Sequence, residues 1–215
     1  MKIAILGAGG HGKVVCDAML SMGVAAEDFV GFIDDDPAAV GRTVMGFPVL
    51  QSLDRLGLDR SVRIAMGIGD NAARRRQFER AVALGYEPFT VVHARAVLGR
   101  GSVLGRGVVV FANVVVNPDS QIDDDVILNT ACSVDHDCRI GAHVHVAPGA
   151  RLAGGVVVGE DTLIGIGSSV MPYLSIGPRC IVGAGAAVVA SIEADCVAVG
   201  VPARSRKRKG APTSG

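Results

Sequence analysis

A histidine between two carboxylates, Asp135-His136-Asp137, is the strongest candidate for chemistry in the sequence. A carboxylate next to an imidazole orients the ring and favours its charged form, which suits a general base. The spacing of the surrounding apolar residues predicts that His136 points outward beside a turn. His136 is therefore a candidate general base, and an exposed histidine in a polar turn is the alternative interpretation.

A second candidate lies near the N-terminus, where Gly7, Gly9 and Gly12 form a GxGxxG motif between a predicted strand and a predicted helix. Asp34 follows Gly12 at the spacing of a dinucleotide fingerprint. Only about 90 residues precede the next region, too few for two mononucleotide-binding halves, which argues against an NAD-dependent enzyme. One half-site predicts a nucleotide-sugar, with backbone N–H groups of the helix N-terminus at a phosphate. A tight turn without a ligand is the alternative.

These candidates must be positioned by two different kinds of structure. The first half alternates strand and helix patterns, with strands over 2–6, 29–33 and 61–68 and helices over 13–22 and 72–84. Asp70 is the expected N-cap of the second helix. This alternation predicts a small parallel sheet with crossover helices, a Rossmann-like α/β domain over residues 1–90.

The second half has a period of six. Val, Ile or Leu occupies seventeen consecutive positions at this spacing: 92, 98, 104, 110, 116, 122, 128, 134, 140, 146, 152, 158, 164, 170, 176, 182 and 188. Such a repeat predicts a coil of short parallel strands with three flat faces and about 18 residues per turn. The fifth position of each hexad also points inward and is small or slim, as at Cys132 and Cys138. Corner glycines such as Gly99 and Gly141 are expected to supply the tight turns.

Composition excludes several classes. The 215 residues carry 21 basic and 21 acidic side chains, which argues against nucleic acid or an anionic membrane as partner. No apolar run of about 18 residues occurs, so no membrane span is expected. Five cysteines without a CxxC pair and the lack of a secretory signal after Met1 predict a cytoplasmic protein.

Four segments carry a family resemblance: residues 7–12, Ile33-Asp34-Asp35, residues 134–138 and Gly200-Val201-Pro202-Ala203-Arg204. In this order, on an unbroken hexad register, they resemble the bacterial sugar acyltransferases related to sialic acid O-acetyltransferase. The nearest resemblance is to the N-acetyltransferases of nucleotide-linked 4-amino sugars (bacillosamine and perosamine types), in the hexapeptide-repeat superfamily. The resemblance implies a left-handed parallel β-helix over 91–203. The basic run that begins at Arg204 and the Ala-Pro-Thr-Ser-Gly that follows it predict a basic tail over 204–215 that is partly disordered beyond Lys207. The resemblance also implies a homotrimer with active sites between subunits.

The resemblance further implies an acetyl-CoA-dependent N-acetyltransferase that acts on a UDP- or GDP-linked 4-amino-4,6-dideoxy sugar. In such enzymes the equivalent of His136 takes a proton from the sugar amine, and the acidic neighbour, here Asp137, raises its basicity. The implied acetyl-CoA contacts are His145, Gly154 (through its backbone N–H), Ile166 and Ala184, and Arg204 is a candidate for the CoA 3′-phosphate. The implied nucleotide-sugar contacts are Gly9, Gly10, His11, Asp34, Asp35 and Gly69.

The sequence leaves three alternatives to an N-acetyltransferase to consider. O-acetylation of a sialic acid or another sugar hydroxyl would use the same histidine. A catalytically silent sugar-nucleotide-binding scaffold needs neither His136 nor Asp137. A zinc site of the γ-carbonic anhydrase kind would need three convergent ligands, and His136, His143 and His145 do not recur at the spacing of the coil, so no metal is expected.

Overall fold

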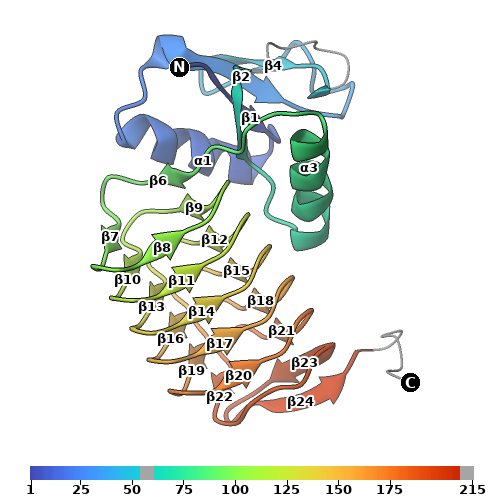
Figure 1. The fold of residues 1–215 in the computed structure, drawn as a ribbon. Coiled ribbons are helices and arrows are strands. Elements are labelled where there is room, and N and C mark those ends of the chain that lie inside the picture. Colours follow the sequence, from blue (N-terminus) through green and yellow to red (C-terminus); the bar gives the residue numbers. More distant parts are fainter. Residues whose placement is uncertain (54–60, 209–215) are drawn as a thin grey trace.

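A computed structural model describes residues 1–53 and 61–208. An N-terminal α/β domain sits on one end of a long β-helix, and the C-terminal strands lie at the other end (Figure 1). The N-terminal elements are β1 (Ile3–Leu6), α1 (Gly10–Ser21), the 3₁₀ helix η1 (Ala26–Asp28), β2 (Phe29–Ile33), β3 (Thr43–Val44), β4 (Phe47–Leu50), β5 (Arg63–Met66) and α3 (Asn71–Ala83).

The N-terminal sheet has the strand order β3-β4-β2-β1-β5. The strands β2, β1 and β5 are parallel, as predicted. The sequence patterns did not predict β4, which pairs parallel to β2, or β3, which forms an antiparallel hairpin with β4. α1 begins at Gly10, three residues before the predicted start, because the glycines after β1 turn directly into the helix. The prediction for Asp70 is confirmed, since its carboxylate accepts a hydrogen bond from the N–H of Ala73 at 2.8 Å.

The β-helix is built from seventeen two-residue strands, β6 to β22, which stack in parallel into three sheets. Their bounds are β6 Val91–Val92, β7 Val97–Leu98, β8 Val103–Leu104, β9 Val109–Val110, β10 Val115–Val116, β11 Gln121–Ile122, β12 Ile127–Leu128, β13 Ser133–Val134, β14 Arg139–Ile140, β15 His145–Val146, β16 Arg151–Leu152, β17 Val157–Val158, β18 Leu163–Ile164, β19 Ser169–Val170, β20 Ser175–Ile176, β21 Ile181–Val182 and β22 Ala187–Val188. Each strand pairs with the strand 18 residues away, for example Val116 with Val134, so the predicted parallel coil is confirmed.

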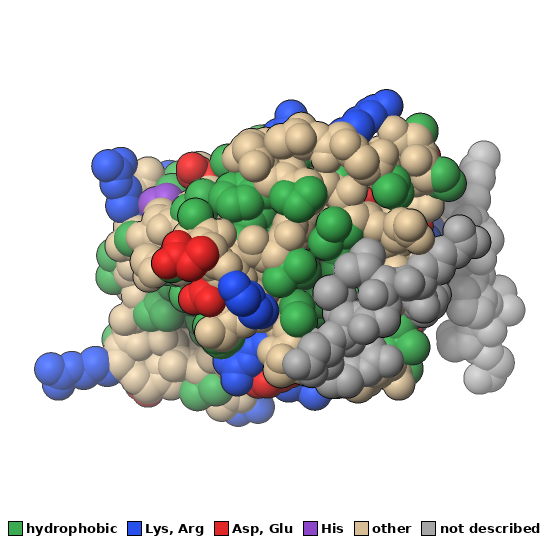
Figure 2. All heavy atoms as spheres, turned by 90° about the horizontal axis from the view of Figure 1, so that it is seen from above, with side chains coloured by type: hydrophobic (Ala, Val, Ile, Leu, Met, Phe, Trp, Pro, Cys, Tyr) green, Lys and Arg blue, Asp and Glu red, His purple; other side chains and the backbone are tan. Residues whose placement is uncertain are grey.

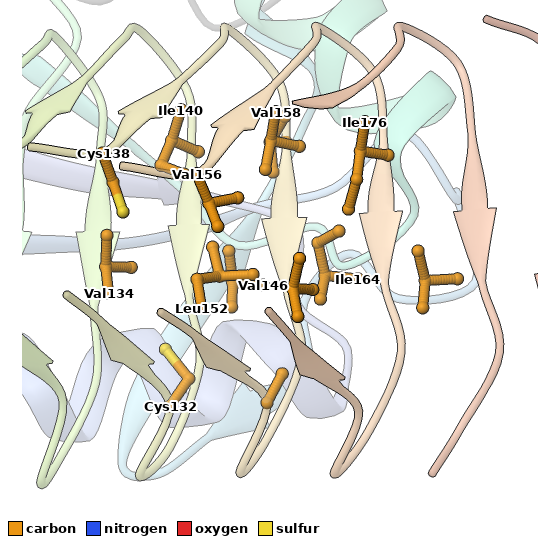
Figure 3. Packing of buried hydrophobic residues seen from close by; sticks show 14 of the residues in the cluster. Cys132, Val134, Cys138, Ile140, Val146, Leu152, Val156, Val158, Ile164 and Ile176 are labelled. Carbon is orange, nitrogen blue, oxygen red and sulfur yellow. The ribbon is translucent and has the colours of Figure 1, made fainter. Parts of the chain in front are cut away.

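The interior of the coil follows the hexad pattern. Aliphatic side chains of the first position and small side chains of the fifth form one buried column, which includes Cys132, Cys138 and Val146 (Figure 3). Leu98, in the first coil, is exposed because no complete coil lies beyond it, and Leu174, the one bulky residue at position five, is only partly buried. All five cysteines are buried and unpaired, so they act as small core residues.

The corners correct one expectation. Every sixth residue from Gly101 to Gly185 has a positive φ, and most of these residues are not glycine. Aspartate tolerates this left-handed conformation better than most residues with a Cβ, and it recurs here, as at Asp119 and Asp137. Gly99 and its equivalents serve a different purpose, because a Cβ on Gly99 would lie 2.5 Å from the backbone nitrogen of Pro118. These glycines allow close stacking of successive coils.

The C-terminal end closes with β23 (Cys196–Val199) and β24 (Arg204–Lys207), which pair antiparallel. The first part of the predicted tail, Arg204–Lys207, is therefore a strand that pairs with β23. The disorder expected beyond Lys207 falls mainly on residues 209–215, outside the described residues. In the described part of the chain, no helix has the length and apolar character needed to cross a bilayer. Seen from the N-terminal domain, acidic and basic side chains are interspersed (Figure 2).

Candidate active site

His136 lies at the corner between β13 and β14, where the coil passes from one sheet to the next. Its side chain is 49% exposed, and its Nδ1 is 2.7 Å from Oδ2 of Asp137. Asp137 is one of the corner residues with positive φ. The same aspartate thus fits the corner backbone and holds the imidazole, which leaves Nε2 as the free nitrogen of the ring.

The other carboxylate, Asp135, has a different task. Its Oδ1 accepts hydrogen bonds from the amide of Asn117 at 2.6 Å and from the backbone N–H of His136 at 2.8 Å. These bonds lower the pKa of Asp135 and tie the corner to the preceding coil. Asn117 was not singled out from the sequence, although its spacing of one full coil, 18 residues before Asp135, is the signal that could have found it.

Gly154 lies one coil beyond His136. A Cβ on Gly154 would come within 2.5 Å of Nε2 and 2.6 Å of Cε1 of His136, so the glycine leaves room for the ring. Among the described residues, no acceptor meets the N–H of Gly154. On the next coil the exposed ring of Tyr173 lies over Gly155, where a Cβ would be 2.5 Å from it. A free backbone donor therefore lies beside the free nitrogen of His136.

Asp137 raises the pKa of His136, mainly through the hydrogen bond to its ring. A general base works in its neutral form, so a raised pKa moves the acid limb of the rate profile to higher pH. Asp137→Asn removes the negative charge, and we expect the midpoint of that limb to move to lower pH while the maximal rate falls. A kcat/KM profile from pH 5 to 9 measures this shift. An unchanged midpoint would show that Asp137 does not act on the titrating group.

A first cavity of about 370 Å³ lies at the end of the N-terminal sheet, around the glycine motif. Each predicted nucleotide-sugar residue lines it: Gly9, Gly10, His11, Asp34, Asp35 and Gly69. α1 has no side-chain cap and no acidic residue in its first turn, so its N-terminus is free to face an anion. Gly12 is needed for packing, because a Cβ there would collide with the carbonyl oxygen of Gly7.

The two aspartates of the first cavity are already engaged. Asp34 accepts hydrogen bonds from the N–H groups of Ala8 at 2.9 Å and Asp36 at 3.0 Å, so it braces the turn around the glycines. Asp35 is 2.9 Å from Arg80 and 2.7 Å from the amide of Gln77, both on α3. Gln77 also lines the cavity and was not predicted.

A second, larger cavity of about 1000 Å³ lies between α3 and the sheet that contains β12, β15, β18 and β21. Of the predicted acetyl-CoA residues, it is lined by His145, Ile166 and Ala184. Arg204 lies in β24 and lines neither cavity, whereas Arg75, Arg76, Arg179 and Arg208 line this one. The sequence did not single out these arginines because they come from three distant segments.

The two cavities share a wall. Gly69 lines both, and the ring of His11, from the first cavity, lies 6.2 Å from that of His145, from the second. Burial lowers the pKa of each imidazole to about 4, with a further contribution from the positive charge of Arg74. Both rings are therefore neutral at pH 7. Nε2 of His145 is 3.0 Å from Nδ2 of Asn129, a contact that sequence reasoning also missed.

His136 is not brought together with this wall. It lies on the edge between the other two sheets, away from the sheet that carries the second cavity, and it lines neither cavity. Gly154 lies on the same edge. One chain therefore presents two separate groups of residues, which we call half-sites: the His136 imidazole beside the backbone N–H of Gly154, and a pair of cavities that meet at Gly69.

His136, His143 and His145, the possible zinc ligands in the sequence, have different surroundings. His143 is buried, with its Nδ1 2.8 Å from Oδ2 of Asp125 and its ring against Phe78. Across residues 1–53 and 61–208, no group of three or more His, Cys, Asp or Glu side chains is arranged to hold a metal ion.

Comparison with known proteins connects both domains to one activity. Residues 2–81 match the PglD N-terminal domain family. Over 222 aligned residues the chain is 31% identical to the GDP-perosamine N-acetyltransferase of Escherichia coli O157:H7, which covers 98% of this chain and 97% of that protein. Two solved structures are similar over both domains. PerB from Caulobacter crescentus, in complex with CoA and GDP-perosamine, has a TM-score of 0.88, 39% identity and coverage of 96% of this chain and 97% of its own. The acetyltransferase domain of PglB from Neisseria gonorrhoeae FA1090 has a TM-score of 0.87, 36% identity and coverage of 94% and 98%. With similarity over nearly the whole of each relative, the chain belongs to the bacterial sugar N-acetyltransferases of the hexapeptide-repeat superfamily.

Proposed function

We propose that the protein transfers the acetyl group of acetyl-CoA to the 4-amino group of a nucleotide-linked 4-amino-4,6-dideoxy sugar, with His136 as general base. The observation that carries this proposal is the wall shared by the two cavities at Gly69. A sugar nucleotide in the first cavity and a thioester in the second would meet there, between His11 and His145. The GDP-perosamine in the PerB complex favours GDP over UDP as the nucleotide.

The residues of the His136 corner supply the chemistry. Nε2 of His136 accepts a proton from the sugar nitrogen as that nitrogen attacks the thioester carbon. The N–H of Gly154 donates to the carbonyl oxygen as negative charge develops on it. When the carbon–sulfur bond breaks, the sulfur leaves with the bonding electrons and takes the proton that His136 had accepted. The amide product and CoA then carry the atoms of both substrates.

The second cavity, of about 1000 Å³, has a lining that suits the donor. Its walls combine apolar side chains of the coil, such as Leu163 and Ile166, with arginines. Arg76 is exposed and makes no ion pair with any described residue, and Arg179 and Arg208 lie nearer the C-terminal end of the coil. Guanidinium groups bind phosphates well, so we assign the CoA phosphates to this arginine set rather than to Arg204.

The separation of the half-sites within one chain supports a homotrimer in which each active site is shared. In that arrangement the partner subunit's His136 completes the site formed by Gly69 and His145. Subunits carrying His136→Asn and subunits carrying His145→Ala would then complement one another when co-assembled. In randomly mixed trimers of equal proportions, about a quarter of the interfaces unite two intact halves, so we expect about a quarter of wild-type activity.

Activity of refolded or co-expressed mixtures, compared with each variant alone, measures this complementation. A site contained within one chain would give no recovery, because every subunit of the mixture carries one lesion.

The reaction itself is tested by release of CoA thiol from acetyl-CoA against a panel of UDP- and GDP-linked 4-amino sugars and free sialic acid. We expect thiol release with a nucleotide-linked amino sugar and formation of an amide that resists mild base. Release only with sialic acid, giving a base-labile ester, would favour the O-acetyltransferase alternative. The five buried, unpaired cysteines favour action in the cytoplasm, where thiols stay reduced.

A further inference from the structure

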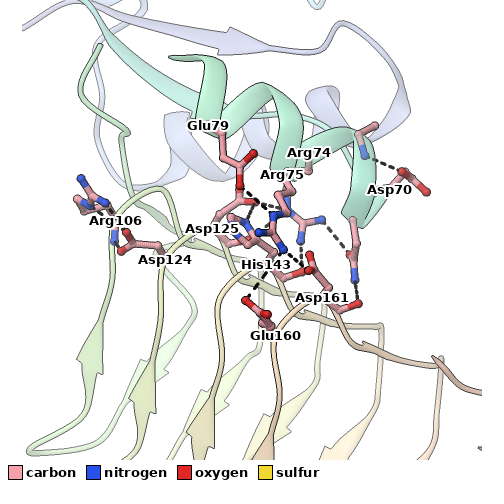
Figure 4. A network of polar contacts seen from close by, with 12 residues as sticks. Asp70, Arg74, Arg75, Glu79, Arg106, Asp124, Asp125, His143, Glu160 and Asp161 are labelled. Carbon is pink, nitrogen blue, oxygen red and sulfur yellow. Dashed lines mark hydrogen bonds and ion pairs between the residues drawn. The ribbon is translucent and has the colours of Figure 1, made fainter. Parts of the chain in front are cut away.

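Arg74 is an arginine with no solvent exposure, on the first turns of α3 (Figure 4). Its Nε donates to Oδ2 and to the carbonyl oxygen of Asp125, both at 3.1 Å, and its Nη2 donates to the carbonyl oxygen of His143 at 2.7 Å. Its Nη1 donates to Oδ1 of Asn71 at 3.1 Å and to the carbonyl oxygen of Gly69 at 3.4 Å. One guanidinium thus joins two corners of the coil to the loop that precedes α3.

A buried ion pair of this kind is a poor source of stability, because removing both charges from water costs about as much as their attraction returns. The partners of Arg74 nevertheless make further polar contacts of their own. Oδ2 of Asp125 also meets Nδ1 of His143 at 2.8 Å, and the amide of Asn71 lies 3.3 Å from the carbonyl oxygens of Asp161 and Thr162. The contacts of Arg74 therefore point to the group that the arginine holds.

That group is Gly69, the residue on the wall of both cavities. The Gly69 backbone lies beside the ring of His145 as an acceptor and favours the charged form of the imidazole, which offsets a small part of the lowering of its pKa by burial. Nε2 of His145 faces the amide nitrogen of Asn129, since Oδ1 of Asn129 accepts from the N–H of Thr130 at 2.8 Å. Nε2 therefore accepts from Asn129, and the proton of the neutral ring is on Nδ1, the nitrogen that is left for the Gly69 carbonyl.

We propose that Arg74 is a positioning residue of the acetyl-transfer site, which holds the Gly69 carbonyl so that His145 keeps one orientation and one tautomer. This inference rests on the proposed function for its catalytic consequence but not for its structural one. The buried charge of Arg74 acts in the same direction, because it lowers the pKa of both His145 and His11 and keeps the two rings neutral.

The test separates positioning from folding by comparing variants in one background. Asp125→Asn alone keeps an oxygen acceptor for Arg74, and the double variant Arg74→Met/Asp125→Asn removes the arginine without leaving a buried, unpaired carboxylate. Relative to Asp125→Asn, we expect the double variant to lose about 10- to 100-fold in kcat, as when a reacting geometry is misplaced by about an ångström. Arg106→Met removes an exposed arginine paired with Asp124 on a nearby corner and is expected to leave kcat unchanged.

A spectroscopic readout makes the test independent of activity. The chain has five histidines, so ¹⁵N-histidine labelling gives few ring signals, and His145→Gln identifies that of His145. At pH 7 we expect a single Nδ1–H tautomer of His145 in the Asp125→Asn protein and a tautomer mixture in the double variant. Arg74→Lys, which keeps the charge but lacks the forked guanidinium, is expected to give the mixture too and serves if the double variant does not fold.

Unchanged kcat and an unchanged His145 tautomer in the double variant, or in Arg74→Lys, would overturn the proposal. A wild-type protein that releases no thiol with any sugar nucleotide would instead overturn the proposed function, and the tautomer measurement would still decide the role of Arg74.

Discussion

Replacing His136 with asparagine is expected to lower kcat by at least about 100-fold, the lower end of what a general base contributes. Asparagine cannot accept the proton of the attacking amine, and it is close to histidine in size. The side chain is half exposed. Its ring contacts Asp137 and occupies the room that the missing side chain of Gly154 leaves. The melting temperature and the affinity for both substrates should therefore change little.

His93 supplies a matched control for this substitution. It lies at the start of the coil, where its Nδ1 accepts from the N–H of Arg95 at 2.9 Å, and it lines neither cavity. His93→Asn should retain wild-type kcat. A loss of kcat in His136→Asn would then be specific to position 136 and not a general effect of replacing a histidine by asparagine. Near-wild-type turnover in His136→Asn, measured by thiol release, would remove His136 from the mechanism.

Adding one methyl group at Gly154 is expected to have the second largest effect. The new Cβ of Gly154→Ala would lie 2.5 Å from Nε2 of His136, and since the backbone cannot yield easily, the imidazole must swing away. A displacement of about 1 Å at the reacting nitrogen is expected to cost about 10- to 100-fold in kcat. Steady-state kinetics at saturating substrate measures this loss.

The fold itself should tolerate this methyl group. Gly154 does not have a positive φ, and alanine already occupies the same hexad position at Ala112, Ala142 and Ala184. The melting temperature of Gly154→Ala should stay close to that of the wild type. A variant that keeps full activity would show that the ring has another productive position, and one that unfolds would show that Gly154 serves the coil rather than the site.

Local and periodic features could be predicted from the sequence. The hexad rule specifies which side chains face inward, because each strand is two residues long and every coil repeats the same three faces. Asp137 holds His136 through adjacency in the chain, and Asn117 meets Asp135 through the 18-residue period, which was available but not used. The glycine motif likewise placed the first cavity, since a strand, a tight turn and a helix follow one another directly.

By itself, then, the sequence determined the coil, the orientation of His136 and the position of the first cavity, because each depends on residues that are neighbours in the chain or in a fixed repeat. Only the tertiary structure decided the second cavity and the burial of Arg74. Arg74 reaches Asp125 and His143 across 51 and 69 residues, and its place in α3 alone is typical of a solvated arginine. Docking of α3 onto one face of the coil creates that cavity and buries that charge, and no local pattern encodes where α3 meets the coil.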